Sequence, residues 1–475
     1  MELNRNVLCG YNWHFGPENH SVTSRHFRFN PDGSISGYEH FNEAFWAITD
    51  QRLKIFNANR ELTWIFEHLP SELEVLFIGV YQPDPSHPTR QILSRPAQAP
   101  KIFRVANLAE IASHLGEDRV RCVENGAATR YVSKSCLNDL KLRKTHDIPA
   151  DQRNINDLLE LPGHQVWCLK DAVVFTRHGL VLVDDFLVSE STNQFPFHLY
   201  ENLLFDGETL SVYEEGASAS ISVAYHLTNG NLENYFHYLV ETIAKLSLQF
   251  FMNINSQSGV HVILPTLKET YQLQILELVI SDLANFNPMT LSAQEKVRCD
   301  NLYYAHLYPA GSLYPNEVIL SFSKMLKAAW KKHPFNSGTF ESNRKIYISR
   351  RDSTNRILEN ERLVEEALKG RGFEIFTLTE LTVAEQISLF QSAETIVAPH
   401  GAGLTNIIFC NEGTKILEIH MEGNTNWVYR RLADTLGLKY QFVLGQVSKN
   451  EAESVDARNY CIHAADLMHS LDSLE

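Results

Sequence analysis

From about residue 165 onward, short apolar runs alternate with longer stretches in which apolar residues recur every three or four positions. The runs predict buried strands, and the stretches predict helices with one buried face. Buried strands separated by amphipathic helices are typical of a parallel sheet that is covered on both faces. A polar, turn-rich segment at 334–343 divides this region, so we expect two α/β domains, at 161–333 and at 334–475.

The same alternation predicts individual elements. In the first α/β domain we expect strands over 166–185, 259–265 and 301–306 and helices over 233–251, 268–283 and 316–332. In the second we expect strands over 345–350, 373–378, 394–399, 414–420 and 440–445, and helices over 360–372, 382–393, 426–437 and 456–474. A further helix is expected to start at Gly403, and the helix over 456–474 is expected to close the domain.

The first 160 residues have a different pattern. Short alternating runs, split by turns such as Asp32-Gly33, predict a small all-β domain over residues 1–68. We expect the many aromatic residues of this domain in its core, with a sugar-binding face as the alternative. Residues 69–160 predict a linker or accessory region, because segment 83–100 alone holds five prolines.

Composition narrows the class of protein. The 475-residue chain has 42 lysines and arginines against 57 aspartates and glutamates, a net charge of −15. An acidic surface repels phosphate backbones, so we expect no nucleic-acid partner, although a local pocket can still be basic. The 7 cysteines are far apart, as in proteins of reducing compartments. With no secretory pattern and no apolar run near the ~20 residues of a membrane span, we expect a cytoplasmic protein. Peripheral association with the inner face of a membrane stays open.

The segment 394–410 (ETIVAPHGAGLTNIIFC) carries the most specific motif. Its apolar strand ends at Pro399, and a His-Gly-Ala-Gly turn and an apolar helix follow. Glycines permit a tight turn and a close approach of the backbone to a ligand, and a helix N-terminus offers free N–H groups. At the carboxyl edge of a parallel sheet this combination predicts a site for a diphosphate. The expected contacts are His400, Gly401, Ala402, Gly403, Thr405 and Asn406.

Arg350 is the second candidate for this anion. It directly follows the apolar strand KIYIS, so it lies at a carboxyl strand end, and a guanidinium can contact a phosphate through two N–H groups. Arg351 and Arg356 are nearby candidates with weaker support. The motif differs from the ATPase loop GxxxxGK[ST] and from a dinucleotide GxGxxG loop, which would stand early in its domain.

A polar stripe interrupts the otherwise apolar helix expected at 233–251. Asn234, His237 and Glu241 recur at spacings of three and four, so all three project from one helical face. A histidine and a carboxylate one turn apart can orient each other and act as a general base on a hydroxyl group. The alternative is a core histidine with satisfied hydrogen bonds, and the stripe by itself does not identify which residue is the base.

Glu418 completes the set of candidate residues. It follows the strand TKIL and is expected to accept hydrogen bonds from ribose hydroxyls, with a purely structural carboxylate as the alternative. We find no Asp-x-Asp pair suited to chelating a metal, because Asp184 and Asp185 point to opposite faces of a strand. We therefore expect no metal and no cofactor, with arginine, histidine and backbone N–H groups in place of a cation.

Together these motifs resemble the conserved core of glycosyltransferase family 61. The matching pieces within 344–446 are KIYISR, the Asn-Glu pair after it, GFEIF, EQISLFQSAETIVAPHGAGLTNIIF and GTKILEIH. NYFHYLVE at 234–241 is similar to the family's Asn-x-x-His-x-x-x-acid signature. Bacterial members of capsule or lipopolysaccharide assembly are the most similar in pattern. Pro399 departs from the small residue of many relatives, and the first 150 residues lie outside the resemblance.

The resemblance implies a GT-B fold, in which two Rossmann-like domains face each other across a nucleotide-sugar cleft. It implies inverting transfer of a hexosyl or pentosyl group to a glycan or lipid-linked glycan acceptor, without an essential divalent metal. Arg350, His400 and the following turn would hold the donor diphosphate, and Asn234, His237 and Glu241 would lie on the acceptor side. The alternatives are a non-catalytic carbohydrate-binding or scaffold protein and an enzyme that modifies nucleotide sugars.

Overall fold

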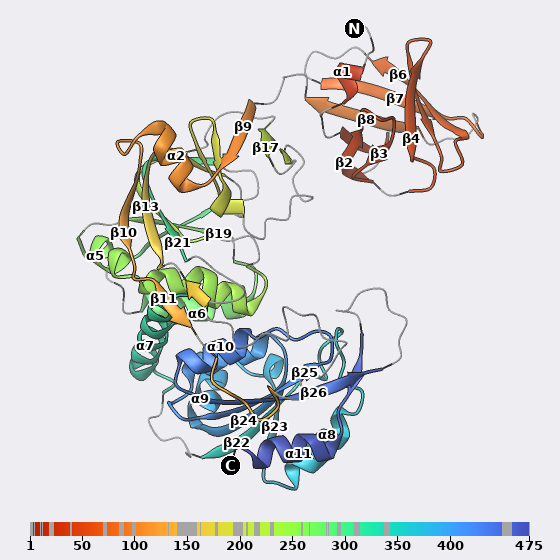
Figure 1. The fold of residues 1–475 in the computed structure, drawn as a ribbon. Helices are drawn as coiled ribbons and strands as arrows, with labels where there is room; N and C mark the ends of the chain where they lie inside the picture. Colours follow the sequence, from red (N-terminus) through yellow and green to blue (C-terminus); the bar gives the residue numbers. More distant parts are fainter. Residues whose placement is uncertain are drawn as a thin grey trace.

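The computed structural model shows a mixed α/β chain with three large β-sheets and one two-stranded ribbon (Figure 1). It describes residues 3, 5–9, 11, 13–18, 23–38, 40–69, 74–84, 90–96, 101–131, 133–139, 159–161, 163–175, 179–192, 203–205, 208–212, 219–228, 232–257, 260–265, 267–281, 283, 285–291, 296–307, 314–336, 343–448 and 458–474.

The N-terminal unit is an antiparallel eight-stranded sheet that stands apart from the other two units in Figure 1. Its elements are the short helix α1 (Arg5–Leu8) and the strands β1 (Trp13–Pro17), β2 (Ser24–Phe29), β3 (Ile35–Ser36), β4 (Phe45–Thr49), β5 (Arg52–Phe56), β6 (Leu62–Leu69), β7 (Glu74–Tyr81) and β8 (Gln91–Pro96). Strand β8 pairs with both β1 and β7, so the expected boundary at residue 68 falls inside the sheet. The proline-rich segment contributes strand β8, in which Pro96 is the single proline and the last residue.

The aromatic residues of this unit form its core, as expected from the sequence. Trp13, Phe27, Phe29 and Phe66 are at most 1% exposed, and their rings and those of their neighbours pack edge to face or tilted. Buried rings cannot stack on a ligand, so the alternative of a sugar-binding face finds no support from these side chains.

The second unit is built on an eleven-stranded mixed sheet. Its strands are β9 (Lys101–Ala106), β10 (Val120–Asn125), β13 (Gln165–Phe175), β14 (Leu180–Val183), β15 (Phe186–Val188), β16 (Leu203–Phe205), β17 (Thr209–Val212), β18 (Ala219–His226), β19 (His261–Pro265), β20 (Asn287–Leu291) and β21 (Lys296–His306). Strands β21, β18, β19 and β20 are neighbours in that order and run parallel, and the remaining strands extend the sheet. Residues 101–125 belong to this sheet, so the expected linker or accessory region at 69–160 is wrong for them.

The C-terminal unit has a six-stranded sheet in the order β23-β22-β24-β25-β26-β27. The strands are β22 (Arg344–Ser349), β23 (Glu374–Thr377), β24 (Ala393–Pro399), β25 (Lys415–Met421), β26 (Lys439–Val447) and β27 (Tyr460–Cys461). The first five are parallel, which confirms the parallel sheet expected here. Strand β27 and helix α11 (Ala464–Asp472) occupy part of the single helix expected over 456–474, because Tyr460 and Cys461 pair antiparallel with β26.

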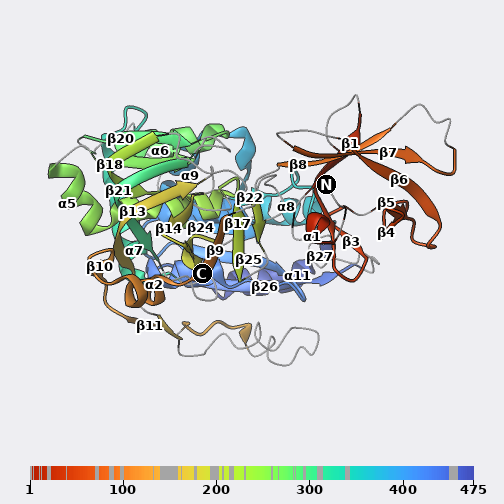
Figure 2. The ribbon, with the colours of Figure 1, turned by 90° about the horizontal axis from the view of Figure 1, so that it is seen from above.

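Helices cover the sheets and fill the space between the second and third units, as the two views in Figures 1 and 2 show. They are α2 (Leu108–Leu115), η1 (Ser189–Thr192), η3 (His237–Thr242), η4 (Ile243–Ser247), α5 (Gln249–Gln257), α6 (Thr270–Ile280), α7 (Asn316–Lys332), α8 (Glu361–Lys369), η5 (Leu378–Glu380), α9 (Val383–Ser392), η6 (Ala402–Phe409), α10 (Val428–Thr435) and α11. Within the described residues, every helix is too short or too polar to cross a bilayer.

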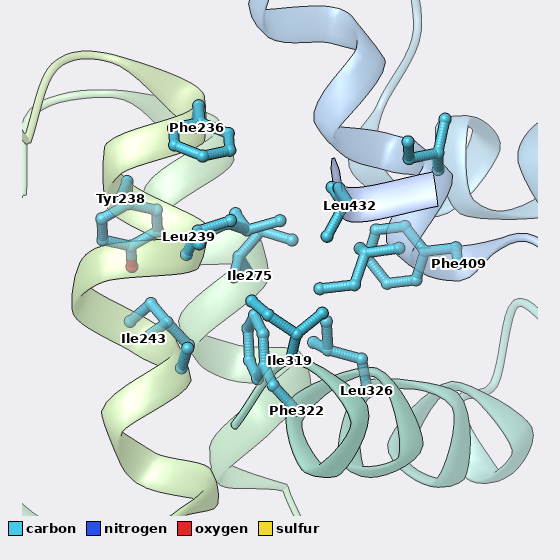
Figure 3. Packing of buried hydrophobic residues seen from close by; sticks show 14 of the residues in the cluster. Phe236, Tyr238, Leu239, Ile243, Ile275, Ile319, Phe322, Leu326, Phe409 and Leu432 are labelled. Carbon is cyan, nitrogen blue, oxygen red and sulfur yellow. The ribbon is translucent and has the colours of Figure 1, made fainter. Parts of the chain in front are cut away.

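One hydrophobic core spans the second and third units. Figure 3 shows Leu239 and Ile243 of the second unit, with Ile319 of α7, facing Phe409 and Leu432 of the C-terminal unit. All of these side chains are at most 5% exposed. Because the two units bury the same apolar surface, packing fixes their relative orientation more firmly than a polar interdomain contact would.

The chain segment from β11 to residue 139 forms a second connection between the second and third units. Strand β11 (Thr129–Tyr131) pairs with β12 (Leu159–Leu161) in the two-stranded ribbon, and residues 133–139 continue from β11 onto the C-terminal unit. We call residues 133–139 the docking segment. Its Asn138 Nδ2 donates to the Phe442 carbonyl at 2.6 Å, a bond between residues 304 positions apart.

Candidate active site

A cleft of about 590 Å³ lies at the carboxyl edge of the C-terminal sheet. In chain order the parallel strands of this sheet have the spatial order 2-1-3-4-5, so the chain reverses direction across the sheet between β22 and β24. Ligands of open α/β sheets bind at this kind of switch point. Ser349 and Arg350 at the end of β22 and Ala398 and Pro399 at the end of β24 line the cleft.

The walls of the cleft come from both units. Tyr235 and residues 269–271 of the second unit face the glycine turn and the start of α9 in the C-terminal unit. Helix α9 begins with a capping box, in which the Thr382 side chain accepts from the Glu385 N–H and the Glu385 carboxylate accepts from the Thr382 N–H. This cap holds Thr382 and Val383 at the cleft wall.

The predicted glycine turn lies in this cleft, with Gly401, Ala402 and Gly403 in its lining. A Cβ atom on Gly403 would come within 2.7 Å of Leu378 Cδ1, and one on Gly401 within 3.0 Å of Arg350 Nε. A larger residue at either position would therefore push the Leu378 or Arg350 side chain aside, while the backbone angles themselves do not demand glycine. The helix that follows, η6, is a 3₁₀-helix rather than the α-helix expected from the apolar spacing.

Arg350 lies where the sequence predicts it. Its Nη1 donates to the His400 carbonyl at 2.5 Å and its Nη2 to Ser353 Oγ at 2.8 Å, while its backbone N–H donates to Glu361 at 2.8 Å. Burial lowers the pKa of this guanidinium, and the nearby Arg356 acts in the same direction. An anion that enters the cleft would stabilise the charge of this partly desolvated guanidinium.

His400 does not line the cleft itself but is fixed behind the turn. Its Nδ1 lies 2.5 Å from Glu418 Oε1, its ring stacks on His420 at 5.3 Å, and its side chain is 15% exposed. Burial lowers the pKa of His400, and the hydrogen bond to Glu418 opposes this shift. With Nδ1 held by a carboxylate, Nε2 is the ring nitrogen left for a ligand.

The expectation that Glu418 contacts a ribose is wrong. Its side chain is fully buried, Oε1 is engaged by His400, and Oε2 accepts from Tyr440 Oη at 2.6 Å and lies 3.3 Å from His420 Nε2. Burial would raise the pKa of Glu418, but His420 and His400 outweigh burial and hold it well below its usual range. Glu418 therefore orients His400.

The same cluster brings together the atom types that bind metals. Ligand-type atoms of His400, Glu418 and His420 lie within 4.8 Å of one another. Both carboxylate oxygens are already engaged within the cluster, so a metal ion would have to replace these contacts. As the side chains stand, the cluster is a hydrogen-bonded pair of histidines around one carboxylate.

Thr405 and Asn406 are also placed differently from the prediction. Both are fully buried, and neither lines the cleft. Thr405 Oγ1 donates to the Ala402 carbonyl at 2.7 Å, and the Asn406 amide donates to Gln386 at 2.9 Å. These side chains stabilise the turn instead of donating to a ligand.

The helical segment of the second unit brings His237 and Glu241 together. His237 Nδ1 lies 2.8 Å from Glu241 Oε1, and Tyr314 Oη donates to the same oxygen. Glu241 is 6% exposed, and the buried Lys245 one turn further on attracts its charge. Burial lowers the pKa of Lys245 to about 8, an effect that Glu241 opposes. The predicted pair is therefore present, and the carboxylate orients the imidazole.

This segment is a π-helix followed by a 3₁₀-helix instead of the single α-helix expected over 233–251. Single π turns are frequent at functional sites, because they shift side chains relative to the regular spacing. Asn234, predicted on the acceptor side, accepts the Phe236 N–H at 2.9 Å through Oδ1, so its observed role is to cap the segment.

The two groups of candidate residues meet at the boundary of the units. Tyr235 Oη donates to Asn406 Oδ1 at 2.7 Å, and the rings of Phe236 and Tyr429 lie 5.9 Å apart. The Tyr429 ring in turn lies 5.3 Å from that of His400. His237 and Glu241 are outside the described lining of the 590 Å³ cleft, but Tyr235, two positions before His237, is part of it.

Sequence reasoning missed three partners of these residues. Lys245 continues the stripe of His237 and Glu241 at the next turn, and that spacing could have revealed it. Tyr314 and Tyr440 approach from other elements, and their contacts with Glu241 and Glu418 span 73 and 22 positions. Nothing in the local pattern of either tyrosine predicts these contacts.

The region that contains most of the candidate residues of both groups matches a known protein family. Residues 235–417 match the family model of glycosyltransferase 61. The match starts at Tyr235 in the cleft wall and ends one position before Glu418, so it includes both histidine sites and Arg350. For this region it confirms the predicted resemblance.

A curated relative supports the same kind of activity. The chain is similar to a beta-1,2-xylosyltransferase of Oryza sativa subsp. japonica, with 24% identity over 211 residues. The aligned part is 41% of this chain and 44% of that protein, so the chain spans less than half the length of this relative.

Proposed function

We propose that the chain is a glycosyltransferase that moves a sugar from a nucleotide-sugar donor to a hydroxyl group of a glycan acceptor. The observation that carries this proposal is the cleft at the switch point, where Arg350 and the Gly401–Gly403 turn face a wall from the second unit. The glycosyltransferase 61 match over 235–417 covers the same residues. The two units would then correspond to the facing halves of a GT-B fold.

In this proposal the donor diphosphate binds at the turn. Arg350 supplies a guanidinium, the turn supplies backbone N–H groups, and His400 approaches from behind with Nε2. An entering anion favours the protonated imidazole, so donor binding is coupled to proton uptake and weakens as the pH rises. Since Glu418 is buried, exposed carboxylates of the lining, Asp352 and Glu380, are the groups available to ribose hydroxyls.

We assign the general base to His237, with Glu241 as its orienting carboxylate. His237 is the more accessible member of the pair, with 22% of its side chain exposed against 7% for Glu241. The acceptor hydroxyl would lose its proton to Nε2 and attack the anomeric carbon opposite the departing diphosphate, which inverts that centre. The proton ends on the imidazole, and Glu241 stabilises the resulting imidazolium.

The finer points of the proposal rest on the sequence, the cytoplasmic location on its cysteine pattern and short apolar runs and the others on the family resemblance. They are metal-independent transfer, a cytoplasmic enzyme at the inner face of the membrane, a lipid-linked acceptor, and a role in capsule or lipopolysaccharide assembly. Of these, metal independence also has a physical argument, because a guanidinium and N–H groups can stabilise a leaving diphosphate.

Thermal unfolding with a panel of UDP-, GDP-, CMP- and dTDP-sugars tests donor binding directly. The panel includes UDP-xylose, because the curated relative is a xylosyltransferase. A donor at 100 times its dissociation constant adds about 2.7 kcal/mol to the free energy of unfolding. We expect one nucleotide class to raise the melting temperature in EDTA as well as in Mg²⁺.

Arg350→Ala and Arg351→Ala form a matched pair for this test. Arg350 lines the cleft, whereas Arg351 is half exposed and pairs with Glu365 at 2.9 Å. We expect Arg350→Ala to abolish the donor-induced shift and to lower turnover about 10²–10³-fold, the typical effect of removing one donor to a developing charge. Arg351→Ala should retain the donor-induced shift in melting temperature and the wild-type turnover. Wild-type turnover by Arg350→Ala would refute this assignment.

A further inference from the structure

The docking segment contributes a buried ion pair to the C-terminal unit. Asp139 accepts from Arg430 through two hydrogen bonds, Nη1 to Oδ1 at 2.8 Å and Nη2 to Oδ2 at 3.0 Å. Arg430 is fully buried and Asp139 is 6% exposed, so neither charge is compensated by water. The hydrogen bond to Asp139 holds the pKa of Arg430 above its usual range despite burial.

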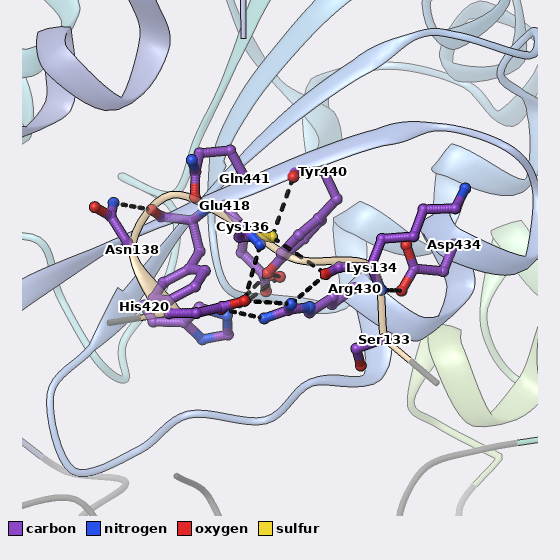
Figure 4. Close-up of polar contacts among 12 residues, drawn as sticks. Ser133, Lys134, Cys136, Asn138, Glu418, His420, Arg430, Asp434, Tyr440 and Gln441 are labelled. Carbon is purple, nitrogen blue, oxygen red and sulfur yellow. Dashed lines mark hydrogen bonds and ion pairs between the residues drawn. The ribbon is translucent and has the colours of Figure 1, made fainter. Parts of the chain in front are cut away.

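Arg430 lies against the residues that hold His400. Its guanidinium carbon is 5.9 Å from the centre of the Tyr440 ring and 5.5 Å from that of Trp427. Tyr440 Oη donates to Glu418, which holds His400 Nδ1. Figure 4 shows Cys136 and Asn138 of the docking segment close to Arg430, Tyr440, Glu418 and His420.

The docking segment also fixes the strand that carries Tyr440. Cys136 Sγ donates to the Tyr440 carbonyl at 3.3 Å and Asn138 Nδ2 to the Phe442 carbonyl at 2.6 Å. These contacts satisfy carbonyl groups along β26, next to β25, which carries Glu418. The position of the Tyr440 hydroxyl therefore depends on the docking segment through both the backbone and the side chain.

We propose that Asp139 is a positioning residue for sugar transfer, which acts through Arg430, Tyr440 and Glu418 on His400. By neutralising Arg430, it lets the guanidinium support the Tyr440 ring without leaving an unbalanced positive charge against the tyrosine that donates to Glu418. This inference rests on the proposed function, in which His400 serves the donor diphosphate.

The pKa of His400 depends on the charged and titratable groups that face it. Glu418 and His420 face it from β25, Tyr429 from α10, and Arg350 and Arg356 from the loop after β22. Loss of the Asp139 charge leaves Arg430 as an uncompensated cation against Tyr440, one hydrogen bond away from Glu418 of this set. A nearby cation disfavours a second positive charge, so the pKa of His400 should fall further.

The test compares Asp139→Asn with Asp434→Asn in the full-length chain. Asp434 also anchors this region, through Tyr131 Oη at 2.6 Å and the Lys134 N–H at 3.2 Å, but it makes no hydrogen bond to Arg430. We expect Asp139→Asn to lower kcat/KM for the donor by about 10- to 100-fold, the usual cost of losing an outer partner of a site histidine. The loss should be larger at pH 8 than at pH 6. Asp434 interacts with the Arg430 charge without a hydrogen bond to it, so Asp434→Asn should change the pH profile less than Asp139→Asn does.

A second measurement does not need turnover. The His400 imidazole, labelled with ¹⁵N and assigned by its absence in His400→Gln, is titrated by NMR in the chain without donor. Asp139→Asn should titrate at lower pH than wild type, and a chain that shows this shift but transfers no sugar would refute only the proposed function. An unchanged His400 titration, or the same shift in Asp434→Asn, would overturn the inference.

Removal of one partner of a buried ion pair can prevent folding, so a double variant accompanies the test. Asp139→Leu/Arg430→Met replaces both charges with apolar groups of similar size. Because no unbalanced cation is left, we expect its His400 to titrate close to the wild-type pH. A titration displaced as far as that of Asp139→Asn would contradict the proposed effect of charge.

Discussion

At the scale of single side chains, the two histidines of the candidate site have matching Nδ1 partners and different surroundings. Each Nδ1 faces a carboxylate, Glu241 at 2.8 Å for His237 and Glu418 at 2.5 Å for His400. His400 is the more enclosed, and burial lowers its pKa. An imidazole whose protonated form is stabilised by an entering anion suits diphosphate binding, whereas the more accessible His237 suits proton acceptance.

His237→Ala is expected to lower kcat about 10²–10⁴-fold, because general-base catalysis contributes on this scale. The KM for the donor should stay near its wild-type value, since His237 does not line the donor cleft. Steady-state kinetics with donor and acceptor both varied measures the effect on kcat separately from the effect on the donor KM. Glu241→Gln should cause a smaller loss, because it retains the shape of the side chain but not its charge. A rise in donor KM with unchanged kcat would argue against the assignment to the acceptor side.

The sequence predicted the contacts of site residues correctly where the two partners are close to each other in the chain. The spacing of His237 and Glu241 predicted their contact, and the strand end predicted Arg350 at the cleft. Glu418 also follows a strand, but it points into a buried cluster. The pattern around a strand end fixes the edge on which a side chain lies, and the packing of its neighbours decides whether it reaches solvent.

At the scale of elements, the turn between β24 and η6 is shaped by what packs against it. A methyl group on Gly403 would meet Leu378 Cδ1 at 2.7 Å, and Leu378 itself lines the cleft. The turn and the cleft wall are therefore coupled by contact, and either can change only if the other moves.

Gly403→Ala is expected to destabilise the fold by about 1–3 kcal/mol, the usual cost of overpacking, and to weaken donor binding more than turnover. Adding Leu378→Ala to Gly403→Ala should restore part of the lost stability and part of the lost donor binding, since it removes the colliding methyl group. Gly370→Ala is the matched control, because its closest contact would be 3.3 Å in an ordinary helical conformation. Denaturant unfolding and the donor thermal shift measure the two effects. Equal losses in the single and double variants would contradict this account.

Element boundaries were predictable where the sequence supplies local signals. The helix expected at 316–332 is α7, Asn316–Lys332, which stops before the turn that contains Pro334. Strand β8 was missed because it lies in the proline-rich segment and pairs with β1, which is distant in the sequence. Strand β27 was missed because it has only two residues and pairs antiparallel with β26. The change from α- to π-helix at His237 has no signature in the apolar spacing, which is similar for both.

At the scale of the whole molecule, the shared core and the docking segment join the second and third units at several places. Buried ionisable groups are part of this interior. Burial lowers the pKa of His226 to about 3 and that of His306 to about 4, and the nearby Lys245 acts in the same direction. Both side chains lie at the carboxyl ends of the neighbouring strands β18 and β21, beside Glu241.

These histidines predict sensitivity to acid. The unfolded chain protonates them near pH 6.5 and the folded chain only near pH 3 to 4, so unfolding takes up protons between these values. Stability should therefore be retained above pH 6.5 and fall by up to about 1.4 kcal/mol per pH unit for each histidine below it. Denaturant unfolding between pH 7 and pH 5 should show a smaller fall for His226→Gln. The exposed His469→Gln is the control, and an unchanged slope in His226→Gln would exclude His226 as the source.

Long-range arrangement was the least predictable level. The alternation of strands and helices predicted two α/β units and the parallel part of each sheet. It did not predict that residues 101–125 complete the sheet of the second unit, nor that Asp139 pairs with Arg430 across 291 positions. Such contacts depend on which side chains are buried together and on their charges in the folded protein. They produce no periodic pattern in the sequence.

The docking segment has a consequence for how the protein is made. During synthesis, Asn138 leaves the ribosome 304 residues before Phe442, to which it later binds. Domains generally fold as they emerge, but this C-terminal unit needs a piece that was translated much earlier and has to stay available. A fragment cut at the apparent border near residue 334 would lack that piece, so expression trials of the C-terminal unit should include the early segment as a separate or fused peptide.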